Sequence, residues 1–167
     1  MAQQKVLHIL RHAKSGWNNE DIADIDRSLK PRGIRNAYEI SRQMKLKGLI
    51  PEYIISGPAD RALHTAVIFA RVFELELKKL QIYNLLYESS SGKMLEFIRK
   101  DGNDCNSLMV VGHNPDVTDL ANAFMKFPIE DIPTSGVVTL IFSCDHWDKI
   151  NRDCLVSHQF NFPSEEE

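Results

Sequence analysis

The sequence predicts an α/β fold, a three-layer sandwich in which helices cover both faces of a mostly parallel central sheet. Short apolar runs, typical of buried strands, alternate along the chain with longer segments in which apolar residues recur at helical spacing. The 167 residues suffice for one domain with a substantial core, and no repeat, linker or low-complexity segment divides them. We therefore expect one domain over residues 1–163 and a solvated acidic tail over residues 164–167.

The predicted strands are short apolar runs. The first spans residues 5–10 and stops at the charged residue Arg11, a pattern typical of a strand that is buried on both faces. Further strands are expected at residues 53–55, 108–111, 137–142 and 155–160, with a polar turn between the last two.

The first and third predicted helices are recognised by their apolar stripes. One begins at Pro31 and ends near Gly48, and another covers about residues 93–100, followed by Gly102. The polar segment 14–30 has no such stripe, so we expect a surface loop or a broken helix there.

Two further helices are predicted from their opening residues. The run Ser56-Gly57-Pro58 supplies a cap and a proline suited to a first helical turn. In the same way, Asn114 can cap a helix that begins at Pro115. Both openings would direct backbone N–H groups at whatever lies beside them.

Composition and charge exclude several classes of protein. A formal net charge of −3 gives no broad basic field, so nucleic acid is not an expected partner. No apolar stretch approaches membrane-spanning length, and the start lacks a basic segment followed by a long apolar run, so we expect no membrane association. The oligomeric state is left open.

The cysteines favour a reducing compartment. Cys105, Cys144 and Cys154 are odd in number and widely spaced, without a CxxC pair, and we expect reduced thiols in a cytoplasmic protein. None of the three is followed by an arginine six residues later, as the Cys-x5-Arg loop of thiol phosphatases requires.

Polar and charged residues follow three of the predicted strands. Arg11-His12 ends the first, Ser56 to Arg61 follows the second, and Gly112-His113-Asn114 follows another. In open α/β sheets, ligands bind beyond the carboxyl ends of the strands. Two arginines and two histidines are therefore predicted to line one crevice.

These residue types suit the transfer of a phosphoryl group. Its peripheral oxygens stay negative, so catalysis needs fixed cationic donors and an in-line nucleophile. Arg11 and Arg61 offer planar, permanently charged donors, and His12 can attack through one ring nitrogen while the other donates to a backbone carbonyl. Nearby positive charge would lower the pKa of His12, and activity should fall in acid. No metal ion and no cofactor are required.

The motifs resemble those of the histidine phosphatase superfamily, the phosphoglycerate-mutase-like group. Leu10-Arg11-His12-Ala13 is similar to its Arg-His signature, and the later blocks follow in order along nearly the whole chain: Leu29 to Gly33, Ser56-Gly57-Pro58 with Arg61-Ala62 and Thr65-Ala66, and Val111-Gly112-His113-Asn114-Pro115. The variant Arg-His-Ala-Lys-Ser with Trp17, in so short a chain, is most similar to SixA-type phosphohistidine phosphatases. Most of the superfamily has glycine in place of Ala13.

The resemblance implies a covalent phosphohistidine mechanism. His12 would be the nucleophile, and Arg11, Arg61 and His113 would form the phosphate pocket. Glu88 is the candidate for the proton donor that larger members carry between the second arginine and the second histidine, although an ordinary surface acid fits it equally well.

Several other residues have competing interpretations. Lys14, Ser15, Trp17 and Asn114 are secondary candidates for contacts with substrate, while Asn114 also suits a helix cap and Trp17 also suits packing. Asp26 and Arg27 are expected to brace the loop through a local ion pair.

Other kinds of site find little support. His8 and His12 have the spacing of a metal pair on a helix, but their segment is predicted to be a strand. Asp24 and Asp26 do not follow an apolar strand, as the aspartyl phosphatase motif would require.

The leading hypothesis is a metal-independent phosphatase acting on phosphohistidine in a protein such as a phosphorelay carrier. The alternatives are a phosphatase for a small phosphate ester and a phosphoprotein-binding module with vestigial catalysis. The intact set of Arg11, His12, Arg61 and His113 argues against the binding module, since a binder does not need the nucleophile.

Overall fold

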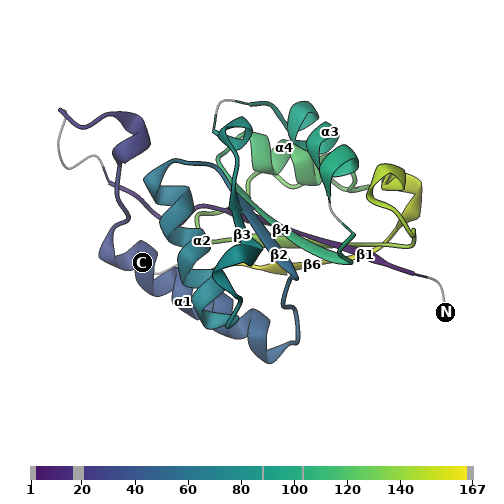
Figure 1. Ribbon diagram of the computed structural model, residues 1–167, viewed down its shortest axis with the longest axis horizontal. Coiled ribbons are helices and arrows are strands. Elements are labelled where there is room, and N and C mark those ends of the chain that lie inside the picture. The colour runs from purple at the N-terminus through teal and green to yellow at the C-terminus, as the bar shows by residue number, and fades with distance from the viewer. Residues whose placement is uncertain (1–2, 17–20, 88, 103, 165–167) are drawn as a thin grey trace.

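The computed structural model is built around one six-stranded sheet with the strand order β3-β2-β4-β1-β5-β6 (Figure 1). It describes residues 3–16, 21–87, 89–102 and 104–164. The strands are β1 (Lys5–Arg11), β2 (Tyr53–Ser56), β3 (Leu80–Ile82), β4 (Ser107–Gly112), β5 (Val137–Phe142) and β6 (Leu155–Asn161). Strands β1 to β4 are parallel, and β5 pairs antiparallel with both β1 and β6. The α/β class and the mostly parallel sheet predicted from the sequence are confirmed.

Helices cover both faces of the sheet, as Figure 1 shows. The helices are α1 (Pro31–Leu46), α2 (Asp60–Val72), α3 (Ser91–Asp101) and α4 (Asp116–Asn122). Helices α1 and α2 share one apolar core layer with β1, β2 and β4, and α3 and α4 share the other. None of the helices in the described part of the chain is long and apolar enough to cross a membrane.

Strand β1 holds the two core layers together. Leu7 and Ile9 belong to the layer under α3 and α4, whereas Leu10 belongs to the layer under α1 and α2. Fully burying one such side chain contributes about 1.5–3 kcal/mol. The apolar core therefore fixes the carboxyl end of β1, where Arg11 and His12 stand.

One polar pair lies inside this core. His8, on β1, is buried and its ring Nδ1 lies 2.7 Å from the hydroxyl oxygen of Thr139 on the adjacent strand β5. Burial lowers the pKa of His8 to about 4, so the ring is neutral near pH 7.

Some elements differ from the predictions. Strand β3 was missed because it has only three residues, all of them half-buried or exposed, and no apolar run. Helix α2 begins at Asp60 rather than at Pro58, and its N-cap residue, Ala59, has no side-chain oxygen; the hydroxyl of Ser56 donates to the carbonyl oxygen of Gly57 instead.

The loop between β1 and α1 agrees with the expected irregular segment. It holds a short 3-10 helix, η1 (Asp24–Asp26), and an isolated bridge between Ser15 and Leu29. Helix α1 ends two residues before Gly48, which has a φ of 74° and suits glycine at a helix end.

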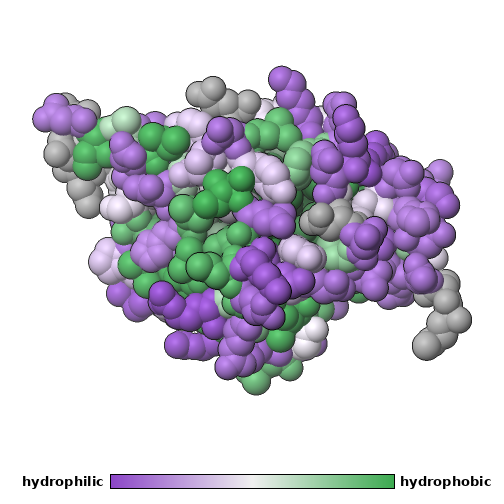
Figure 2. Space-filling model, viewed as in Figure 1, coloured by the Kyte–Doolittle hydropathy of each residue, from purple (hydrophilic) through white to green (hydrophobic). Residues whose placement is uncertain are grey.

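The face of the molecule in Figure 2 is largely polar. Polar side chains cover the end over α3, while apolar side chains gather nearer the centre, over α2 and β3. Leu77 and Ile82, near this region in the chain, are among the exposed apolar residues. Scattered apolar side chains are ordinary on a protein surface and do not mark a binding face by themselves.

Candidate active site

The carboxyl ends of β1, β2 and β4 meet at one edge of the sheet. In the register of the parallel strands, Arg11 pairs with Gly112 and Ser56 with Val111. A pocket of about 290 Å³ opens there. Its lining comes from segments far apart in the sequence: Arg11, His12, Lys14, Ser15, Arg27, Arg61, His113, Asn114 and Thr134. The predicted convergence of two arginines and two histidines in one crevice is therefore found in the structure.

His12 stands directly after β1, at the base of this pocket. Its ring Nδ1 lies 2.7 Å from the carbonyl oxygen of Ala13, which accepts the Nδ1 proton in the neutral ring. This is the kind of partner that the sequence predicted, and it leaves the lone pair on Nε2.

The pKa of His12 is lowered to about 3, chiefly by burial. The hydrogen bond to Ala13 opposes this shift, and the charges of His113, Arg61 and Arg11 add to it. From the sequence, positive charge alone was expected to lower the pKa of His12; burial is the larger cause.

A short chain of hydrogen bonds holds the end of β1 against α2. The backbone N–H of Ala13 donates to the hydroxyl oxygen of Thr65 at 2.9 Å, and that hydroxyl donates to the carbonyl oxygen of Arg61 at 2.6 Å. Since all three residues are buried, this link fixes the position of the Arg61 backbone relative to His12.

Arg61 is buried, with 5% of its surface exposed, although an arginine in a first helical turn is usually solvated. Its Nη1 donates to the carbonyl oxygen of Asp24 at 2.7 Å and its Nη2 to a carboxylate oxygen of the same residue at 3.0 Å. The hydroxyl of Tyr87 donates to that carboxylate oxygen as well, at 2.7 Å.

The carboxylate of Asp24 stays ionised in this setting. Burial alone would raise its pKa, but hydrogen bonds from Tyr87 and Arg61, together with the charges of Arg61 and Arg27, hold the pKa below its usual value. Arg27 pairs with the other oxygen of this carboxylate at 3.0 Å. The expected brace of the loop thus joins Arg27 to Asp24 rather than to Asp26.

His113 follows β4 on the opposite side of the pocket. Its ring centroid lies 5.4 Å from that of His12 and 5.6 Å from that of Tyr87. Burial, followed by the charge of Arg61, lowers the pKa of His113 to about 4, against the opposing charge of Asp24. Both histidines are therefore neutral near pH 7.

Several nitrogens around this pocket are buried and have no hydrogen-bond partner among the residues that the structure describes. They are Nε of Arg11, Nε of Arg61 and both ring nitrogens of His113. Buried polar groups in proteins are nearly always hydrogen-bonded, so a group of unpaired ones in one pocket is typical of a ligand site. Three of these four nitrogens carry an N–H donor whichever tautomer His113 adopts, which suits an anion.

Of the secondary candidates for substrate contact, some line the pocket and others lie outside the described residues. Lys14 and Ser15 line the pocket. Asn114 lines it too, but its side-chain amide donates to Asp131 and to the carbonyl oxygen of Ile132, and it does not cap α4, whose N-cap residue is Pro115. Trp17 and Glu88 lie outside the described residues.

The position of Lys14 depends on a close approach of the backbone. Gly33, in the first turn of α1, packs so tightly against Lys14 that an added Cβ would lie 2.3 Å from the Lys14 carbonyl oxygen. That oxygen accepts a hydrogen bond from the N–H of Lys30 at 2.8 Å. Only glycine fits there.

The strand-end rule did not select four polar residues at or beside the pocket: Asp24, Arg27, Asp131 and Thr134. Asp24 and Arg27 lie well inside the loop between β1 and α1, and Asp131 and Thr134 lie in the segment before β5, so none of the four directly follows a strand. Arg27 and Asp24 did carry a signal, since they are oppositely charged and three residues apart.

The family is decided by a model of the "Histidine phosphatase superfamily (branch 1)", which matches residues 7–97. The chain belongs to the histidine phosphatase superfamily. Members of this superfamily are hydrolases that act without a metal ion, and the protein is accordingly a phosphatase. The matched residues include His12 and Arg61, and His113 lies beyond them.

Individual proteins resemble the chain over most of its length. An uncharacterized protein of Mycobacterium tuberculosis is 30% identical, and the match covers 92% of this chain and 99% of the relative. A structure from Agrobacterium tumefaciens, assigned as the phosphohistidine phosphatase SixA, is 26% identical with a TM-score of 0.74, covering 81% of this chain and 90% of that one.

A second histidine phosphatase structure shares the fold alone. The mycobacterial glucosyl-3-phosphoglycerate phosphatase is 13% identical with a TM-score of 0.67, and the match covers 96% of this chain and all of that one. Structures of the same fold thus include one described as a phosphohistidine phosphatase and one described as a phosphatase of a small molecule.

Proposed function

We propose that the protein is a phosphohistidine phosphatase that removes phosphoryl groups from a phosphorylated protein such as a phosphorelay carrier. The observation that carries the proposal is the set of unpaired, buried nitrogens of Arg11, Arg61 and His113 that shares a pocket with the neutral ring of His12. A tetrahedral anion would satisfy these groups.

In the proposed reaction, Nε2 of His12 attacks phosphorus and the bond from phosphorus to the substrate nitrogen breaks. The leaving imidazole takes a proton from solvent. Water then attacks phosphorus, the bond to Nε2 of His12 breaks, and inorganic phosphate leaves. The hydrogen bond to Ala13 keeps the ring oriented through both steps.

Arg11, Arg61 and His113 would hold the phosphoryl oxygens during these steps. A guanidinium donates to two oxygens at once, and in a buried pocket such donors stabilise the developing charge without having to reorganise. Lys14 and Ser15, which also line the pocket, would contact the oxygens or the atoms beside them.

Among the described residues no unpaired carboxyl group lines the pocket, which favours phosphohistidine over an ester. Asp24 and Asp131, the two carboxylates that contact the pocket's arginines among the described residues, are both ion-paired. An alkoxide leaving group needs a proton donor more than an imidazole does. Glu88, outside the described residues, would serve as that donor only in the alternative reaction.

The size of the pocket points in the same direction. At about 290 Å³ it lies at the lower end of the usual range for small-molecule sites, roughly 300–1,000 Å³. It would admit a phosphoryl group on a protein side chain more readily than it would enclose a whole metabolite. A small phosphate ester remains the second candidate, because a structure of this fold is a glucosyl-3-phosphoglycerate phosphatase.

The compartment belongs to the proposal as well. Cys105, Cys144 and Cys154 are all free thiols. Free thiols are typical of proteins in a reducing compartment, which supports a cytoplasmic location.

The test compares two substrates and one variant. Wild-type protein and His12→Ala are incubated with a phosphohistidine protein and with an aryl phosphate, and released inorganic phosphate is measured. We expect turnover of the phosphoprotein at the higher kcat/KM, and loss of turnover in His12→Ala. A rapid acid-free quench with labelled substrate should trap label on wild-type protein only.

Faster turnover of the aryl phosphate would favour the small-molecule alternative. Turnover of neither substrate, with retained binding of the phosphoprotein, would instead support a binding module.

A further inference from the structure

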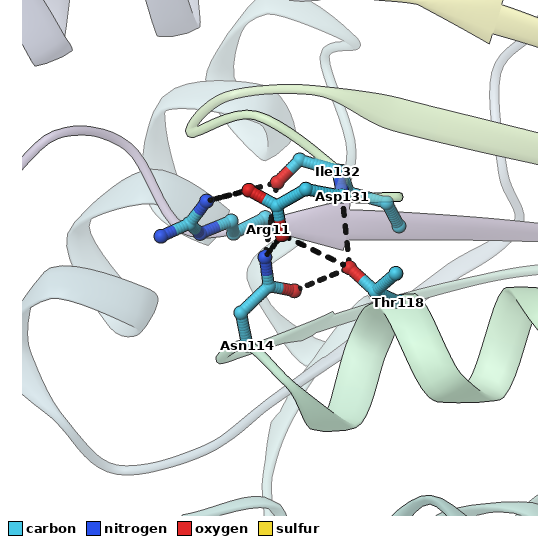
Figure 3. A network of polar contacts seen from close by, with 5 residues as sticks. All are labelled: Arg11, Asn114, Thr118, Asp131 and Ile132. Carbon is cyan, nitrogen blue, oxygen red and sulfur yellow. Dashed lines mark hydrogen bonds and ion pairs between the residues drawn. The ribbon is translucent and has the colours of Figure 1, made fainter. Parts of the chain in front are cut away.

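The loop before β5 carries a carboxylate that the proposed reaction does not use. Asp131 lies beside Arg11, with a carboxylate oxygen 3.3 Å from Nη1 of the guanidinium (Figure 3). The same Nη1 donates to the carbonyl oxygen of Ile132 at 2.9 Å. One edge of the Arg11 guanidinium is thus held by two consecutive residues, while its Nε has no hydrogen-bond partner in the described part of the chain.

The same two residues also hold the segment that follows β4. The side-chain amide of Asn114 donates to the other carboxylate oxygen of Asp131 and, at 3.1 Å, to the carbonyl oxygen of Ile132. Figure 3 shows Asp131 between the side chains of Arg11 and Asn114. Asp131 therefore joins the end of β1 to the residue next to His113.

Thr118, in α4, completes the network. Its hydroxyl donates to the side-chain oxygen of Asn114 at 2.7 Å and accepts the backbone N–H of Ile132 at 3.0 Å. These bonds fix which face of the Asn114 amide donates, so both N–H groups point at Asp131 and Ile132. Asp131, Asn114 and Thr118 are thus all hydrogen-bonded within the protein.

We propose that Asp131 is a positioning residue, which orients Arg11 and the segment around His113 for binding of the phosphoryl group. The inference rests on the proposed function in one respect, the assignment of Arg11 to the phosphoryl oxygens. An arginine side chain has several rotatable bonds, and fixing one edge of its guanidinium on Asp131 keeps the other available for the anion before it arrives.

The negative charge of Asp131 and its positioning of Arg11 predict opposite changes in anion affinity when Asp131 is removed. A carboxylate beside an anion site repels the anion, so if only charge mattered, removing Asp131 would strengthen the binding of phosphate. If Asp131 positions Arg11, its removal weakens the binding. The sign of the change separates the two effects.

The test measures the binding of inorganic phosphate and tungstate by calorimetry, together with kcat/KM, for wild type, Asp131→Ala and Asp131→Asn. Glu130→Gln is the matched control, because Glu130 is the neighbouring exposed acid. We expect Asp131→Ala to raise the Kd for both anions and to lower kcat/KM by about tenfold, the order expected for one charge-assisted hydrogen bond. Asp131→Asn keeps an acceptor for Arg11 and should fall between wild type and Asp131→Ala.

Glu130→Gln should leave the Kd unchanged or slightly lower. The side chain of Asp131 is 58% exposed, so neither Asp131→Ala nor Asp131→Asn should change the melting temperature much. Unchanged or tighter anion binding in both Asp131 variants would overturn the inference.

The binding measurement keeps the two hypotheses apart. If wild-type protein binds the anions but turns over no phosphorylated substrate, the proposed function fails and the Kd values still decide the role of Asp131. If wild-type protein binds neither anion, the pocket is not an oxyanion site and both proposals fall.

Discussion

The two arginines of the pocket are held in different surroundings. Arg61 comes from the first turn of α2, is almost completely buried, and has both terminal nitrogens bonded to Asp24. Arg11 comes from the end of β1, its side chain is 24% exposed, and one terminal nitrogen is bonded to Asp131 and Ile132. Each arginine is braced by an aspartate from a loop, but the brace of Arg61 is the deeper one.

The difference appears in the electrostatics of the histidines. The charge of Arg61 lowers the pKa of both His12 and His113, and at His12 it acts more strongly than the charge of Arg11. A charge in a buried setting is screened less by water and reaches further. Burial therefore makes Arg61 the group that influences both rings, even though Arg11 is the neighbour of His12 in the sequence.

The largest effect is expected for Arg61→Ala. Removing one preorganised donor of this kind costs on the order of 3 kcal/mol of transition-state stabilisation, so kcat/KM should fall a hundredfold or more. Arg71→Ala, in the same helix but hydrogen-bonded to Tyr38 on the surface, is the control and should retain turnover. Full activity in Arg61→Ala, measured on the preferred substrate, would show that the deep arginine is not part of the site.

A smaller effect is expected for Asp24→Ala. The carboxylate holds Arg61, Arg27 and Tyr87 together, and the carbonyl oxygen of residue 24 would still accept from Arg61. We expect kcat/KM to fall by more than the roughly tenfold loss predicted for Asp131→Ala, since the deeper brace has more partners. Kinetics of the two variants on one substrate make the comparison, and an equal or larger loss in Asp131→Ala would reverse it.

The smallest effect is expected from mild acid. Because the pKa values of His12 and His113 lie near 3 and 4, both rings stay neutral at pH 5. After correction for ionisation of the substrate, kcat/KM should change by no more than about twofold between pH 7 and pH 5, whereas a histidine of ordinary pKa would lose about thirtyfold. In Arg61→Lys, which keeps the charge, this profile should be preserved; an acid limb near pH 6.5 in wild type would contradict the assignment of a buried neutral nucleophile.

Much of the fold could be predicted because its main strands are unambiguous. The run before Arg11 and the run before Gly112 are largely buried, so they are mostly apolar and stand out in the sequence. Strand β3 lies at the edge of the sheet, has only three residues and needs no apolar run. Its pairing with β2 is a tertiary contact that cannot be predicted from the composition of the segment itself.

The site could be predicted in part for the same reason. Residues at strand ends, such as His12 and His113, follow from topology, because parallel strands bring their carboxyl ends together. Asp131 precedes a strand and belongs to no motif, and its partners lie 120 and 17 residues away. Only the folded chain brings such a residue to Arg11.

The buried pair of His8 and Thr139 makes the free energy of unfolding depend on pH in the acid range, where the nucleophile is still neutral. Below about pH 6.5 His8 is protonated in the unfolded chain but stays neutral in the folded one, so the free energy of unfolding falls with pH. The fall ends near pH 4, where His8 is protonated in the folded chain as well. Across that interval His8 alone would remove up to about 3 kcal/mol from the free energy of unfolding. Acid should therefore lower the free energy of unfolding while the ring of His12 is still neutral and able to attack.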